Sequence, residues 1–138
     1  MTTLKISDLS AGDWVRVINQ FDAQIDGYHS GNGSLSLKTR QRNLVYYRLE
    51  DVSPIPITAK ILEANGWKKG QRGEFYHYLQ LDKNSTLYVH ASTNGWRVEI
   101  TYDAAGILRT THLMTDVVSI HQLQHALRLA GADEEINL

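Results

Sequence analysis

Alternating hydrophobic and polar residues predict several short strands in the first part of the chain. In SLSLK, residues 34–38, leucines alternate with polar residues, which is the period of a half-buried strand. WVRVI (14–18) and LVYYRLEDV (44–52) are rich in strand-forming side chains. DGYHSGNGS (26–34) is rich in Gly, Ser and Asn and predicts a loop or a wide hairpin tip. We therefore expect a strand-rich, small barrel-like lobe over residues 1–53.

The pattern changes in SPIPIT, where Pro54 and Pro56 force extended geometry on the residues before them. AKILEAN (59–65) then has the spacing of a short helix, with Thr58 as its N-cap. Four segments of strand length follow, separated by the turn-like sequences DKNS, TNG and DAAG, and they predict an antiparallel meander. These segments are EFYHYLQLD, TLYVHAS, GWRVEITYD and ILRTTHLM.

The third segment of the meander alternates cleanly, and we expect one of its faces to meet a core and the other to meet water. Its apolar positions are Trp96, Val98 and Ile100, and its polar positions are Arg97, Glu99 and Thr101. After the meander, SIHQLQHALRLAG (119–131) predicts a final helix, because its apolar residues recur at helical spacing. Ser119 can cap this helix and Gly131 can end it.

Together these patterns predict an α+β fold. The strand-rich lobe (1–53) is followed by an α-β-β-β-β-α lobe (54–138), whose two helices cover one face of the meander. We expect the two lobes to form one compact unit, because each is small for a stable core of its own.

Composition narrows the class of protein. The 138 residues are 42% hydrophobic and 21% charged, with a net charge of −1. A nucleic-acid-binding protein is usually more basic, so nucleic acid is not an expected partner, and sequence-independent binding would have to rest on a local basic patch. The absence of cysteine excludes disulfides and thiolate metal sites. No apolar run reaches the ~20 residues that cross a bilayer, and the first residues lack the apolar block of a signal peptide. We expect an unprocessed cytoplasmic protein with no membrane association.

The most site-like spacing is that of His121 and His125, because histidines four apart on a helix can chelate one ion. However, HQLQH lacks the glutamate of the H-E-x-x-H zinc motif, and no third ligand is fixed by the sequence. The alternative is that both histidines form the polar border of an amphipathic helix. We therefore expect no metal or other cofactor, and we keep both histidines as ligand-contact candidates.

Basic and aromatic residues supply the other candidates. The basic clusters are Lys38, Arg40 and Arg42, and Lys68, Lys69 and Arg72. Either could hold a phosphate or a nucleotide, and a solvated surface is the alternative. Tyr76 and Tyr78 could stack a base, against the alternative of cross-strand packing. His29 falls in the predicted loop, as a solvated or a lid residue. The candidate ligand-binding residues are Lys68, Lys69, Arg72, Tyr76, Tyr78, His121 and His125.

The chain contains three longer motifs, which are DLSAGDWV (Asp8 to Val15), PIPIT-x-x-IL-x-x-x-GW (Pro54 to Trp67) and VSIHQLQHALRLAG-x-x-EE (Val118 to Glu135). These motifs resemble those of a family of small uncharacterised proteins encoded mainly by phages, prophages and mobile elements of gut Bacteroidetes. The resemblance implies a phage or mobile-element setting and no mechanism. It also implies that His121 is common in the family, whereas the place of His125 is often taken by a residue such as Asn.

No G-x-S-x-G elbow, P-loop or G-x-G-x-x-G is present, so no catalytic residue is named and an enzyme is not the favoured class. We expect a non-catalytic accessory protein of phage or mobile-element origin that counters host defence. It would bind or sequester a small anionic, nucleotide-like ligand or a host protein. A homo-oligomer is a further expectation, since open sheet edges and amphipathic helices offer symmetric contacts. The alternative is a small histidine- or metal-dependent hydrolase or phosphodiesterase.

Overall fold

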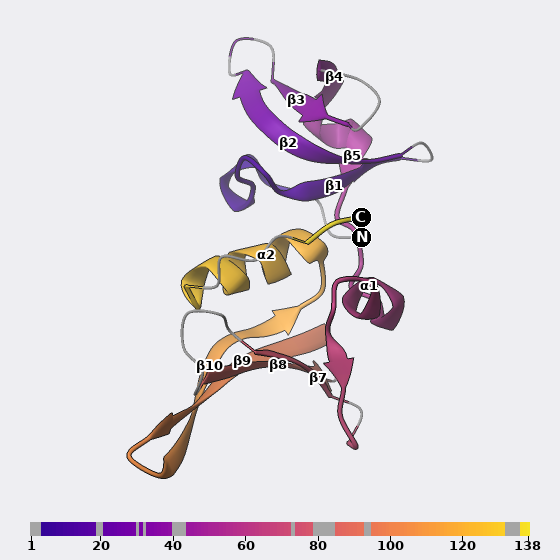
Figure 1. Ribbon diagram of the computed structural model, residues 1–138. Helices are drawn as coiled ribbons and strands as arrows, with labels where there is room; N and C mark the ends of the chain where they lie inside the picture. Colours follow the sequence, from indigo (N-terminus) through magenta and orange to yellow (C-terminus); the bar gives the residue numbers. More distant parts are fainter. Residues whose placement is uncertain are drawn as a thin grey trace. The chain divides into compact units, whose positions relative to one another are not determined.

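A computed structural model describes residues 4–18, 21–29, 31, 33–39, 44–72, 74–78, 85–92, 95–131 and 136–138 (Figure 1). The chain divides into two compact units, Met1–Pro56 and Ile57–Leu138. The observed boundary follows Pro56, and the predicted boundary follows Ser53, so both lie in the SPIPIT segment. That the two lobes form one compact unit stays a prediction.

The N-terminal unit is an antiparallel sheet of five strands in the order β4-β3-β2-β1-β5. Its strands are β1 (Trp14–Val17), β2 (Phe21–His29), β3 (Ser34–Lys38), β4 (Leu44–Arg48) and β5 (Val52–Ser53), with short 3₁₀ turns at Ile6–Asp8 and Leu49–Asp51. The expected barrel is not confirmed, because β4 and β5 are the two edges of the sheet in the strand pairings of the described residues. The expected loop over residues 26–34 is wrong in its first half, since β2 continues to His29.

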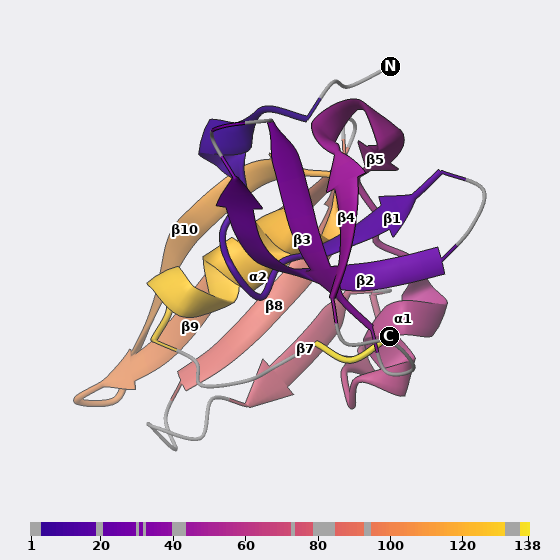
Figure 2. The same ribbon diagram turned by 90° about the horizontal axis from the view of Figure 1, so that it is seen from above.

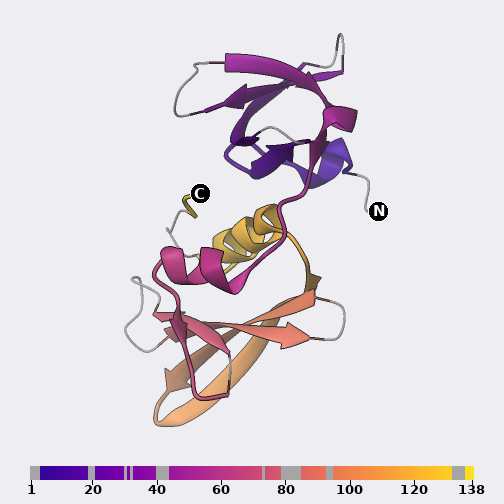
Figure 3. The same cartoon turned by 90° about the vertical axis from the view of Figure 1, so that its right-hand side faces the viewer.

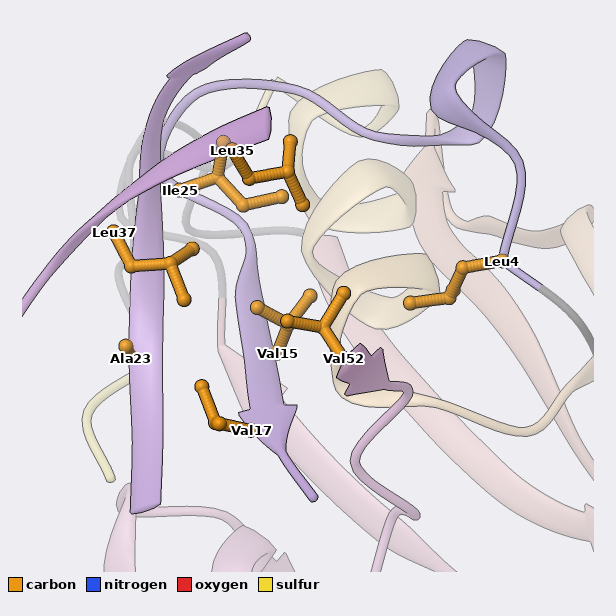
Figure 4. Packing of buried hydrophobic residues seen from close by; sticks show 8 residues of the cluster. All are labelled: Leu4, Val15, Val17, Ala23, Ile25, Leu35, Leu37 and Val52. Atoms are coloured by element: carbon orange, nitrogen blue, oxygen red, sulfur yellow. The ribbon is translucent and has the colours of Figure 1, made fainter. Parts of the chain in front are cut away.

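The core of this unit lies on one face of the sheet, where apolar side chains from four of its strands converge together with Leu4 (Figure 4). The buried set is Leu4, Val15, Val17, Ala23, Ile25, Leu35, Leu37 and Val52. Leu35 and Leu37 are the two leucines of the alternating SLSLK segment, and both are fully buried. Burial of a leucine side chain contributes about 1.5–3 kcal/mol, so this alternation decides which face of β3 meets the core.

The C-terminal unit is a second antiparallel sheet of five strands, in the order β10-β9-β8-β7-β6, with two helices. Its elements are α1 (Ala59–Ala64), β6 (Lys68–Lys69), β7 (Phe75–Tyr78), β8 (Ser85–Ser92), β9 (Gly95–Ala104), β10 (Ile107–Val117) and α2 (Ile120–Leu129). Figures 1 and 3 show both helices on the same side of the sheet. Figure 2 shows strands β7 to β10 side by side, with the tip of the β9–β10 hairpin reaching beyond the rest of the sheet.

The two helices begin and end where local chemistry predicts. The side chain of Thr58 accepts a hydrogen bond from the Ile61 amide at 3.2 Å, which caps α1, and Gly66 leaves the helix with a φ of +85°. At the start of α2 the side-chain oxygen of Gln122 accepts from the backbone amides of Val118 at 2.8 Å and of Ser119 at 3.2 Å. The bond from Ser119 satisfies the backbone amide of the N-cap, as the N3 side chain of a capping box does.

The predicted α+β class is confirmed by these strands and helices. The meander and both helices lie where the sequence placed them. Lys68–Lys69, for which the sequence predicted no strand, form the short edge strand β6. None of the helices in the described part of the chain combines the length and apolar composition that crossing a bilayer requires.

Candidate functional site

An open hollow of about 490 Å³ lies on the N-terminal unit, lined by His29, Gly31, Ser34 and Tyr46. The rings of His29 and Tyr46 meet edge to face, with their centroids 5.3 Å apart and their planes at 61°. Tyr46 is 60% exposed, so most of its ring is accessible to a ligand. Volumes of about 300–1,000 Å³ are typical of small-molecule sites.

A β-bulge places His29 in this hollow. In the pairing of β2 with β3, Ile25 lies opposite Leu37, but Gly27 lies opposite Ser36, so β2 advances by two residues where β3 advances by one. The extra residue reverses the alternation of β2, because successive side chains in a strand point to opposite faces. His29 therefore lies opposite Ser34 on the polar face of the sheet, whereas unbroken alternation from Ile25 would direct it to the core.

Gly31 and Ser34 are the two small residues that line the hollow, and they form its floor. On the face away from the leucines, β3 carries Ser34 and Ser36, and Ser36 lies between Gly27 on β2 and Tyr46 on β4. Gly31 has open space where a Cβ would be. Because these residues are short, the rings of Tyr46 and His29 stand above their neighbours as walls.

One exposed cation lies beside this floor. Arg48 is the register partner of Ser34 on β4, and its side chain is 76% exposed. It lies 3.4 Å from the carboxylate of Glu50, whose side chain is also largely exposed. Exposed ion pairs contribute about 0–1 kcal/mol, so an incoming anion can compete with Glu50 for this guanidinium. The first basic cluster of the sequence begins at Lys38, which is exposed at the end of β3. The other two members, Arg40 and Arg42, lie outside the described residues.

A second polar cluster occupies the C-terminal sheet and is centred on Glu99. The Nε of Arg97 lies 2.6 Å from one carboxylate oxygen of Glu99, and the Nε2 of His90 lies 3.5 Å from the other. The ring of Tyr88 is nearly parallel to that of His90, with 5.8 Å between centroids. The Glu99 side chain is 11% exposed, although the sequence predicted that this position would face water.

The cluster lies on the sheet face away from the helices. Val89 and Val98 are fully buried register partners on β8 and β9, whereas His90 and Glu99 occupy the alternate positions of the same strands. Across the sheet one row of register partners passes through Glu99. It runs Lys68, Tyr76, Tyr88, Glu99 and His112, one residue from each of the five strands.

The predicted ligand residues are only partly brought together. Lys68 and Tyr76 fall in that row, and Tyr78 is two residues further along β7, with the side chains of both tyrosines outside the described part of the structure. Lys69 pairs with Phe75, in the row next to that of Lys68, and Arg72 lies in the turn after β6.

His121 and His125 lie instead on α2. Their rings meet edge to face at 5.9 Å, and His121 is only 4% exposed, with its Nδ1 3.1 Å from the hydroxyl of Ser119. His121 is therefore packed at the helix start rather than on the polar border that the sequence suggested. Among the described residues no three His, Asp or Glu side chains gather as metal ligands.

The hollow and the Glu99 cluster were both missed as sites by the sequence prediction. The alternation of GWRVEITYD correctly separates Val98 from Glu99, but it does not show that Arg97 and His90 enclose the carboxylate. For His29 the signal was the glycine-rich segment around it, which is consistent with a bulge but does not locate one.

No family model, curated protein or solved structure matches this chain.

Proposed function

We propose that this chain is a non-catalytic binding protein that takes up a small ligand carrying a flat ring and an anionic group, such as a nucleotide. The observation that carries the proposal is the hollow in which the rings of Tyr46 and His29 stand above a floor of small residues. A flat ring can stack on Tyr46, since aromatic stacking contributes about 1–3 kcal/mol per base in other proteins.

The polar groups around the hollow suit such a ligand. His29 and Ser34 line it with an imidazole and a hydroxyl, which can hydrogen-bond to the edge of a heteroaromatic ring. Arg48 lies opposite Ser34 on the next strand and supplies a guanidinium for a phosphate. We further propose, from the sequence motifs alone, a phage or mobile-element setting in which sequestering a host nucleotide would blunt a defence.

Equilibrium binding to a panel of nucleoside mono-, di- and cyclic phosphates tests the proposal. For the nucleotide that binds, Tyr46→Ala is expected to weaken affinity by about tenfold, as expected for the loss of one stacking contact. Tyr28→Ala is the matched control, because Tyr28 is a 47% exposed tyrosine on β2 that does not line the hollow. Arg48→Gln is expected to weaken nucleotides but not the corresponding nucleosides. Equal effects of the two tyrosine variants, or no binding of any nucleotide, would contradict the proposal.

The Glu99 cluster favours a hydrolase or phosphodiesterase as a second candidate function. A carboxylate beside an imidazole can hold the ring in a fixed orientation, which is how many general bases are positioned. One experiment distinguishes the two functions. The protein is incubated with the nucleotide that binds it in the panel and is then denatured, and the released nucleotide is analysed. Intact nucleotide supports sequestration. Converted nucleotide supports an enzyme, and His90→Gln would then abolish conversion while leaving binding in place.

A further inference from the structure

The carboxylate of Glu74 folds back into the turn between β6 and β7. One of its oxygens accepts a hydrogen bond from the Arg72 amide at 3.1 Å, and the backbone carbonyl of Glu74 accepts from the Gly70 amide at 2.7 Å. A Cβ built on Gly70 would overlap the other carboxylate oxygen of Glu74. The missing side chain of Gly70 is therefore the space that the carboxylate fills.

This turn is strongly basic apart from Glu74. Lys68, Lys69 and Arg72 are all exposed, and no ion pair to any of the three is found within the described parts of the chain. Residues 68–74 contain three cations and one carboxylate, so this segment carries a net positive charge.

A backbone amide, a position without a Cβ and nearby cations are the components of an anion-binding concavity. In this turn the anion already present is the protein's own carboxylate. We propose that the β6–β7 turn is an oxyanion site that Glu74 keeps closed, and that phosphate-type anions bind there by displacing the Glu74 side chain. The proposal does not depend on the hollow of the N-terminal unit.

Inorganic pyrophosphate, titrated calorimetrically into the full chain, is a suitable probe. Glu74→Ala empties the site and is expected to tighten binding by about tenfold over the unmodified protein, the scale of one charge-assisted hydrogen bond. Glu74→Gln is expected to stay close to the unmodified protein, because its amide oxygen can still accept from Arg72. Glu63→Ala is the charge control, since it removes an exposed glutamate from α1 without touching the turn.

Refilling the space gives an independent check. Gly70 does not have a left-handed φ, so Ala at this position is conformationally allowed once Glu74 is removed. The double variant Gly70→Ala with Glu74→Ala is expected to lose the gain in affinity. The proposal is overturned if Glu63→Ala or Glu74→Gln tightens binding as much as Glu74→Ala, because net charge alone would then explain the gain in affinity. It is also overturned if the double variant keeps that gain.

A measurement on the unmodified protein covers the case in which a variant does not fold. Saturating pyrophosphate is expected to shift the amide NMR resonance of Arg72, because its hydrogen-bond acceptor changes. The amide resonance of Ile61, whose acceptor is the Thr58 side chain, should stay in place. An unshifted Arg72 resonance at saturation would also overturn the proposal.

Discussion

The side-chain amide of Asn65 holds the backbone of Asn137, 72 residues further along the chain. Its Nδ2 donates to the Asn137 carbonyl at 3.0 Å, and its Oδ1 accepts from the Asn137 amide at 2.7 Å. The same Nδ2 also donates to the Ile61 carbonyl at 2.9 Å. Next to Asn137, Ile136 is buried. One asparagine thus joins the end of α1 to the end of the chain.

Replacement of Asn65 by Ala is expected to lower the free energy of unfolding by about 1–3 kcal/mol, because it removes three hydrogen bonds at once. Urea denaturation of the full chain measures the change. Asn137→Ala is the matched control, since the bonds use only the backbone of that residue, and it should stay within about 0.5 kcal/mol of the unmodified protein. Similar losses in the two variants would show that the Asn65 bridge is not what holds the tail.

Gly95→Ala is expected to destabilise the C-terminal unit by about 2 kcal/mol or more. Gly95 has a φ of +144°, and a Cβ there would lie 2.8 Å from both the Val117 carbonyl oxygen and a methyl group of Val118. Gly106→Ala separates the two causes, because Gly106 has a φ of +82° but open space around it. Gly106→Ala should lower the free energy of unfolding by only about 1–2 kcal/mol, which is the cost of the backbone conformation alone. Thermal denaturation of both variants measures the two losses. An equal cost at both positions would rule out the steric contribution.

The pair formed by Arg16 and Asp22 is expected to make a small contribution that does not vary with pH over the ordinary range. The Arg16 Nε lies 2.8 Å from Asp22, and this hydrogen bond raises the pKa of Arg16 above its ordinary value, with burial opposing and the charge of Asp22 adding to the effect. A raised folded-state pKa stabilises at every pH below the ordinary value and is lost only as the pH rises through the folded value.

Arg16→Gln should therefore cost less than about 1 kcal/mol, because both side chains of the pair are partly exposed to solvent. The difference should be constant between about pH 6 and pH 10. Chemical denaturation at several pH values checks both statements. A difference that disappears within this range would show that another group titrates with the pair.

His121→Ala is expected to destabilise the protein more than His125→Ala. The ring of His121 is buried and lies against the Ser119 hydroxyl, whereas His125 is only partly buried. We expect a loss of about 1–3 kcal/mol for His121, from the cavity and the lost hydrogen bond together, and a smaller loss for His125. Guanidinium denaturation measures the order, and the reverse order would contradict the packing role of His121.

Addition of zinc, or of a chelator, is expected to leave the melting temperature within about 1 °C of its starting value, because a ligand stabilises only through a site that it binds. The basis is that the described residues offer no third metal ligand near the two histidines of α2. A zinc-dependent rise that is lost in both His121→Ala and His125→Ala would restore the metal hypothesis.

Local patterns were enough to predict both helices and most strands of this fold, but not β2 or β6. The alternation in SLSLK identifies β3 and its core face, and Thr58 and Gly66 mark the ends of α1. These features depend on residues adjacent in the chain, whose periodicity and backbone preferences act over a few positions. The α+β class follows from the order of such elements, and so it was accessible without tertiary information.

The candidate sites depended on register between strands. Only the bulge in β2 brings His29 to the face of Tyr46, and only the pairing of β8 with β9 sets His90 and Arg97 beside Glu99. A single extra residue in a strand reverses which side chains share a face, and no local pattern fixes where it falls. The sequence therefore determined the helices, most of the strands and the core leucines of β3. Tertiary pairing decided the extent of β2, the edge strand β6 and which polar side chains meet, because these depend on partners distant in the chain.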